Sequence, residues 1–140
     1  MKNNHTNNLT HNEIINYTKA WISDAVIGLN LCPFAKSVYI KNQIDYHVST
    51  ATNESLLLND LILAMQKLNQ TDAEDIDTTL VIHPWVLQDF LDYNDFLDQA
   101  DAALNQAGFE GVLQIASFHP QYQFAGTDPD DVTNCSNRSP

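Results

Sequence analysis

Three segments of the chain carry apolar residues at the spacing of three or four that an amphipathic helix requires. The first segment begins with Thr10 and Glu13, which match a capping box, a pair of side chains that bond the unpaired N–H groups at a helix start. The third segment is expected to break near Tyr93 and to end at Gly108, because glycine adopts the left-handed conformation that terminates helices. The predicted helices cover residues 11–29, 53–69 and 85–106.

Three shorter segments are predicted to be strands. Residues 44–48 alternate between apolar and polar side chains, which is the period of a half-buried strand. Residues 78–82 form an almost continuous apolar or β-branched run, which is typical of a strand covered on both faces. Residues 111–118 form the third predicted strand, and residues 30–42 are predicted to be a loop.

The alternation of these segments indicates a small α/β domain of order α-β-α-β-α-β. We expect a sheet of three or more mainly parallel strands, joined by right-handed helical crossovers and followed by a long C-terminal loop. Residues 1–9 are predicted to be a disordered arm, and residues 10–140 to form a single α/β domain. No helix is predicted after the third strand, so we expect either a domain truncated at its C-terminus or a tail that folds back over the sheet.

The charge of the chain narrows the classes of partner. Eighteen acidic against six basic residues give a net charge of −12, so neither nucleic acid nor an anionic membrane surface is expected as a partner. No stretch reaches the ~20 apolar residues of a membrane span, and the first nine residues lack the apolar core of a signal peptide. These features predict a cytoplasmic protein whose two cysteines, Cys32 and Cys135, are free thiols. The sequence leaves the oligomeric state open.

The second and third predicted strands both run into a His-Pro dipeptide, His83-Pro84 and His119-Pro120. Parallel strands end at the same edge of a sheet, and open α/β sheets bind their ligands at that edge. We therefore expect the two imidazoles to face one crevice, as a general acid/base pair or as ligands of a divalent metal. The alternative is that each histidine merely ends its strand and bonds the backbone.

Charged residues near the C-terminus supply further candidates. Asp128, Asp130 and Asp131 lie close enough in sequence to supply a metal ligand or a base, although the segment lacks the Gly and Glu positions of a calcium loop. An Asp- and Pro-rich turn is the simpler interpretation. Arg138 is a candidate anchor for a carboxylate or phosphate, or else an ion-pair partner of Asp130 or Asp131.

Cys32 is a candidate nucleophile. It follows the end of the first predicted helix, where the negative end of the helix dipole disfavours a thiolate. A nucleophilic cysteine would also need an imidazole within hydrogen-bond reach. The competing interpretation is a small buried residue beside Phe34.

Several short motifs are distributed along residues 12–140: LCPFA at 31–35, HP at 83–84, FLDYNDF at 90–96, SFHPQYQFAGT at 117–127 and NRSP at 137–140. Together they resemble an uncharacterised proteobacterial family known only as a domain of unknown function. The resemblance implies a soluble bacterial protein and brings no activity. It places Asn137 in the same motif as Arg138, and we take both as candidate substrate-binding residues. It also implies that family members continue beyond Pro140.

Three classes of function remain. The first is an enzyme acting on a small anionic substrate, with His83, His119, Asp130, Asp131 and Cys32 as candidate catalytic residues. The second is a small-ligand binding domain that uses the same crevice without turnover. The third is a protein-interaction module that presents an incomplete sheet or an aromatic face.

Overall fold

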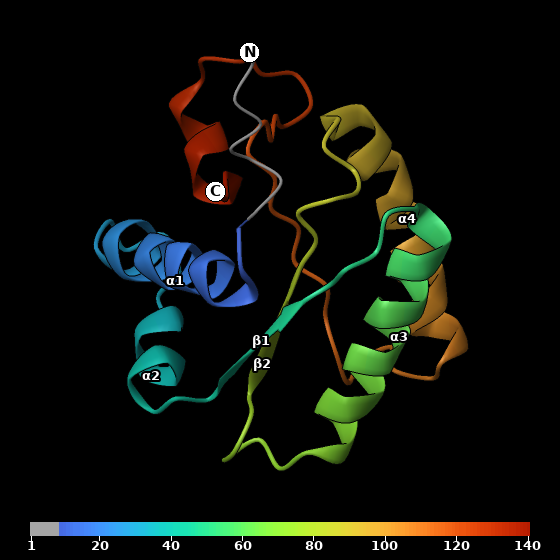
Figure 1. The fold of residues 1–140 in the computed structure, drawn as a ribbon. Coiled ribbons are helices and arrows are strands. Elements are labelled where there is room, and N and C mark those ends of the chain that lie inside the picture. Colours follow the sequence, from blue (N-terminus) through green and yellow to red (C-terminus); the bar gives the residue numbers. More distant parts are fainter. Residues whose placement is uncertain (1–8) are drawn as a thin grey trace.

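The sheet consists of two parallel strands, β1 (Ile44–Val48) and β2 (Thr78–Ile82) (Figure 1). The structure is a computed structural model that describes residues 9–140, so the prediction of an N-terminal arm lies almost wholly outside the described residues. Ile44 pairs with Thr78 and Val48 with Ile82, which confirms both strands and their parallel pairing. The mixed helix and strand content of a small single domain is confirmed as well.

The third predicted strand, residues 111–118, is not a strand in the structure. The segment begins at Gly111, whose φ is 78°, and does not join the ladder of β1 and β2. Its backbone groups bond elsewhere: Phe118 N–H donates to the Tyr93 hydroxyl at 3.0 Å, and His119 N–H donates to the carbonyl of Asn137 at 3.0 Å. Partners from the α4 region and the C-terminus thus replace the strand–strand bonds that the sequence pattern predicted.

The first helix forms as predicted but changes its winding. The helix α1 (His11–Trp21) begins with the capping box of Thr10 and Glu13 and continues as a π-helical segment, η1 (Ile22–Ile27). Its buried residues recur every fourth position, at Ile14, Thr18, Ile22 and Val26. A short helix that was not predicted, α2 (Ala35–Ile40), lies within the expected loop of residues 30–42; it buries no residue and has no side-chain cap, so it carries no sequence signal.

The two longer helices pack together. The helix α3 (Glu54–Gln70) begins at Asn53, whose side chain accepts from Leu56 N–H. The helix α4 (Phe90–Gln106) begins five residues later than predicted, at the cap Asp89, and is not broken near Tyr93. It ends at Gln106, two residues before Gly108, and backbone bonds from the N–H groups of residues 108 and 109 close the helix, as expected for a glycine with a φ of 80°. Every helix within residues 9–140 is too short or too polar to cross a membrane.

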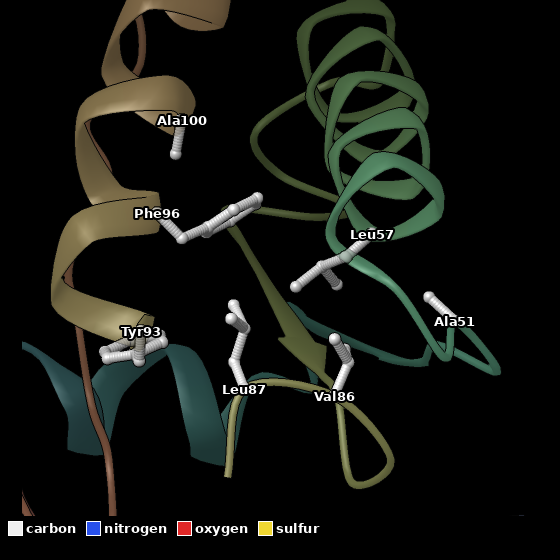
Figure 2. Packing of buried hydrophobic residues seen from close by; sticks show 7 residues of the cluster. All are labelled: Ala51, Leu57, Val86, Leu87, Tyr93, Phe96 and Ala100. Carbon is white, nitrogen blue, oxygen red and sulfur yellow. The ribbon is translucent and has the colours of Figure 1, made fainter. Parts of the chain in front are cut away.

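The helices form one layer on each side of the strands. The pair α3 and α4 covers one face of the sheet, and α1 with α2 lies on the other (Figure 1). The larger apolar core lies between the sheet and the α3–α4 pair, where Leu57 of α3 faces Phe96 and Ala100 of α4 (Figure 2). Val86 and Leu87, from the segment that leads from β2 to α4, close the same core (Figure 2). This packing fixes the start of α4 relative to the end of β2.

The C-terminal segment is organised by polar contacts. A 3₁₀-helix, η2 (Val132–Asn137), lies within the predicted loop and is capped by the Asp131 carboxylate. Asn134 is fully buried; its side-chain oxygen accepts from Phe124 N–H at 2.8 Å, and its amide donates to the Asp128 carbonyl at 3.0 Å. One buried amide therefore fixes both sides of the loop of residues 124–134.

The core predicts a clear difference between two residues of α4. Phe96 is 4% exposed and Leu91 is 70% exposed. Phe96→Ala is expected to lower the free energy of unfolding by about 3–5 kcal/mol, because it removes a buried ring and leaves a cavity. Leu91→Ala, the matched control, is expected to change it by less than about 0.5 kcal/mol. Urea denaturation followed by circular dichroism measures both, and equal losses would contradict the packing described here.

Candidate functional site

Three rings pack together where β2 ends. The ring of Tyr93, from the first turns of α4, stacks on His83 and lies at a tilt of 35° to His119. Its centroid is 5.6 Å from that of His83, with the planes 21° apart, and 5.1 Å from that of His119. His83 continues β2 on the face that Val81 presents to α4, whereas His119 follows the segment of residues 111–118. Both histidines therefore pack against one phenol ring.

Both ring nitrogens of His119 form hydrogen bonds to the backbone. Its Nε2 lies 3.0 Å from the carbonyl oxygen of Leu87, and its Nδ1 lies 3.0 Å from Gln121 N–H. Because a backbone N–H only donates, Nδ1 accepts and Nε2 carries the proton, which fixes one neutral tautomer. The side chain is 3% exposed. His119 thus has no nitrogen left for a proton transfer or a metal.

His83 keeps one nitrogen open. Its Nδ1 donates to the carbonyl oxygen of Val86 at 3.0 Å, so the lone pair lies on Nε2, which has no hydrogen-bond partner within residues 9–140. Burial lowers the pKa of His83 below its usual value; the nearby His119 lowers it further, and the bond to Val86 opposes the change. His83 is therefore a neutral imidazole at pH 7 with a defined direction for accepting a proton.

A strained turn supplies both orienting carbonyls. The segment from His83 to Asp89 connects β2 to α4, and Leu87 within it has a φ of 61°. A branched residue rarely adopts this left-handed conformation, which costs of order 1–3 kcal/mol. The turn presents the carbonyls of Val86 and Leu87 in succession, one to each histidine. The burial of both side chains holds the strained backbone in place.

Tyr93 links the histidines to the rest of the fold. Its hydroxyl accepts from Phe118 N–H, and burial raises the pKa of the phenol, with Tyr122 nearby adding to the effect. Phe90, one turn earlier in α4, lies 5.5 Å from the ring of His119 and 5.2 Å from that of Tyr122. These rings form one aromatic cluster at the start of α4.

A pocket of about 550 Å³ lies next to Phe90. It is formed by the start of α4 and the C-terminal segment, and its charged lining residues are Asp89, Asp130 and Arg138. The guanidinium of Arg138 donates to the carbonyl oxygens of Tyr122, at 3.1 Å, and Pro129, at 2.6 Å. Within residues 9–140 Arg138 forms no ion pair with Asp130 or Asp131. Its remaining N–H groups have no hydrogen-bond partner in the part of the chain that the structure describes.

Two other candidate residues, Asp131 and Asn137, form hydrogen bonds to backbone groups. The Asp131 carboxylate accepts from the N–H and the hydroxyl of Thr133, which lowers the pKa of Asp131. The amide of Asn137 donates to the carbonyl oxygen of Ser117 at 3.0 Å, and its own carbonyl accepts from His119 N–H. Asn137 thus takes the place of a strand partner for residues 117–119.

Cys32 lies in a different segment of the fold from the histidines. It is exposed in the turn between η1 and α2, and Phe34 beside it is 80% exposed, so the interpretation of Cys32 as a buried residue next to Phe34 is wrong. Within residues 9–140 no hydrogen bond joins Cys32 to an imidazole. The same part of the chain holds no group of three His, Cys, Asp or Glu side chains arranged for a metal.

Sequence reasoning missed a second polar contact at this edge of the sheet. Ser49 follows β1, and its N–H donates to the carbonyl of Ile82, immediately before His83. Its hydroxyl donates to the Asp60 carboxylate of α3 at 2.5 Å and accepts from Ala51 N–H. Ser49 is 1% exposed, so this contact anchors the end of β1 to α3. A serine at the end of a strand is common in turns and carries no signal of its own.

The fold and site define an α/β domain with a two-stranded parallel sheet and a cluster of two histidine rings and one tyrosine ring at its carboxyl edge. A family model described as a protein of unknown function, DUF1415, matches residues 13–140. The chain belongs to this family, which confirms the resemblance of its motifs to a domain of unknown function. No curated protein and no solved structure matches the chain.

The lowered pKa of His83 predicts how stability changes with pH. Below the ordinary histidine value of 6.5 the unfolded chain takes up a proton that folded His83 resists, so the folded state loses stability as the pH falls through this value. Wild-type protein is expected to lose more of its melting temperature between pH 7.5 and pH 5.5 than His83→Asn, which keeps a donor for Val86 but does not titrate. His47→Asn, at an exposed position of β1, is the control. Equal pH dependence in wild type and His83→Asn would contradict this assignment.

Proposed function

We propose that the domain is an enzyme in which His83 acts as the general base. The observation that carries the proposal is the bond from His83 Nδ1 to the carbonyl of Val86, which leaves the Nε2 lone pair without a partner within residues 9–140. A neutral imidazole with a fixed tautomer is the arrangement that a general base needs at neutral pH. When Nε2 takes a proton, the bond to Val86 stabilises the imidazolium that forms.

His119 and Tyr93 serve in this proposal as positioning residues. Tyr93 holds the plane of the His83 ring by stacking, and His119 packs against Tyr93 at a tilt of 35°. Both are bonded to backbone groups, so their own positions are fixed by the fold. This replaces the acid/base pair expected from the sequence with a single base and its support.

The pocket next to Phe90 is the proposed binding site for the charged part of the substrate, and because His83 does not line this pocket, the reacting bond of the substrate has to extend beyond it to His83 Nε2. Arg138 offers free N–H groups to a carboxylate or phosphate, which supports the anionic group expected from the sequence. Asp89 and Asp130 line the same pocket and would repel a purely anionic ligand. The charges therefore favour a small zwitterion, such as an amino acid, whose ammonium group lies near the two carboxylates.

The alternative is a binding domain without turnover, which the same pocket favours. Arg138 and the pocket would then recognise the ligand, and His83 would be a satisfied histidine at the end of a strand. Loss of the His83 Nε2 atom would abolish turnover by an enzyme but would leave ligand binding by a binding domain unchanged, because binding in the pocket does not use that atom.

His83→Asn separates these functions, since the asparagine amide can still donate to Val86. With a panel of small nitrophenyl esters and phosphate esters, wild type is expected to turn over at least one compound about 10²–10⁴ times faster than His83→Asn. His47→Asn is the control for hydrolysis by an exposed imidazole. Wild-type rates no higher than those of His83→Asn across the panel would leave only the binding function. Elemental analysis of the same samples tests the divalent-metal hypothesis, which requires metal in wild type that His83→Asn loses.

The charge of the pocket predicts a preference among ligands of equal size. L-alanine and propionate differ by the ammonium group, and alanine is expected to bind more tightly by isothermal titration calorimetry. Asp130→Asn is expected to reduce this preference several-fold by removing one carboxylate. Asp101→Asn, an exposed acid on α4 outside the pocket, is the control. Equal affinity for the two ligands in wild type would refute the zwitterion.

A further inference from the structure

A second pocket is lined by residues of α1, β1 and the end of α2. The helices α1 and α2 lie on the face of the sheet opposite the α3–α4 pair (Figure 1). Its volume is about 600 Å³, within the range of small-ligand sites. The lining residues are Lys19, Tyr39, Ile40, Asn42, Ile44 and Tyr46. None of the residues proposed for catalysis or substrate binding lies in it.

The pocket is positive in a strongly acidic chain. Lys19, in the last turn of α1, is its one charged lining residue. The ammonium lies 5.2 Å from the ring centre of Tyr46, and within residues 9–140 it forms no ion pair. The only ion pair in that range, between Lys67 and Asp45, lies on the other side of β1. Lys19 is thus a cation held over a ring and not neutralised by a carboxylate.

Two phenols and an amide accompany the ammonium. Tyr39 lies close enough to Tyr46 to raise the pKa of its hydroxyl, together with the larger effect of burial. Asn42 has a φ of 54° and is held in the turn that ends α2, where its N–H donates to the carbonyl of Tyr39 at 3.2 Å. The side chains of Ile40 and Ile44 complete the wall. The pocket therefore combines fixed polar groups with an apolar surface.

We propose that this pocket binds a small aromatic or apolar carboxylate. The carboxylate would pair with the Lys19 ammonium and accept from the hydroxyls of Tyr39 and Tyr46, and the apolar body would contact Ile40 and Ile44. A single cation matches a monoanion better than a phosphate dianion, because the net charge of −12 repels the second negative charge.

Benzoate is the probe for this proposal, and benzamide is its neutral analogue. In ¹H–¹⁵N correlation spectra of the 140-residue protein, benzoate is expected to shift the signals of residues near Lys19, Tyr39 and Tyr46 in a saturable way, and benzamide to shift them far less. Lys19→Met is expected to weaken benzoate binding about tenfold, because one charge-assisted bond is lost. Tyr46→Phe, which keeps the ring over Lys19, is expected to weaken it less.

Lys36→Met is the matched control, since it removes the same charge from α2 at a position that does not line the pocket. Unchanged affinity in Lys36→Met beside the loss in Lys19→Met supports the site. Equal affinity in wild type and Lys19→Met, equal shifts by benzamide, or no saturable shift by benzoate overturns it. Wild type and variants should give the same dispersed spectrum without ligand, because the Lys19 and Lys36 side chains are exposed.

Discussion

The carboxyl edge of this domain depends on one aromatic cluster, the packing of Tyr93 against two histidine rings. Tyr93 joins three parts of the chain: the end of β2 through His83, the start of α4, and the segment of residues 111–118 through Phe118 N–H. Tyr93 also belongs to the larger apolar core, with Phe96 and Ala100 of the same helix, and this packing fixes its position (Figure 2). Without the ring, His83 would lose its stacking partner, whereas His119 would still contact Phe90.

Local sequence signals were sufficient for the elements that carry them. The capping box at Thr10, the alternation along residues 44–48 and the glycine at position 108 each act within a few residues, and each prediction is confirmed. The prediction of a third strand was wrong because a local pattern does not indicate which segment the backbone will bond to. Tyr93 and Asn137 bond the backbone of residues 117–119, and no local pattern encodes contacts over such separations.

The candidate site shows the same division. The repeated His-Pro dipeptide pointed to one edge of the sheet, and the structure has both rings against Tyr93. The sequence could not predict that His83 keeps an unpaired nitrogen within residues 9–140 while His119 does not, because this depends on which backbone group each nitrogen bonds. Asn134 and Ser49 were missed because a buried polar side chain looks, in a sequence, like any residue of a turn. The roles of His83, Arg138 and the acidic residues in chemistry stay predictions.

The groups that orient His83 and His119 are main-chain carbonyls, at positions 86 and 87. Every amino acid has such a carbonyl, so no substitution at these two positions can delete it. The site requires only that the backbone conformation at these positions is kept. Many pairs of apolar residues that fill the same core would keep it. Variation at positions 86 and 87 among relatives would therefore be compatible with an unchanged site, and the orienting groups would leave no mark in the identities of aligned residues.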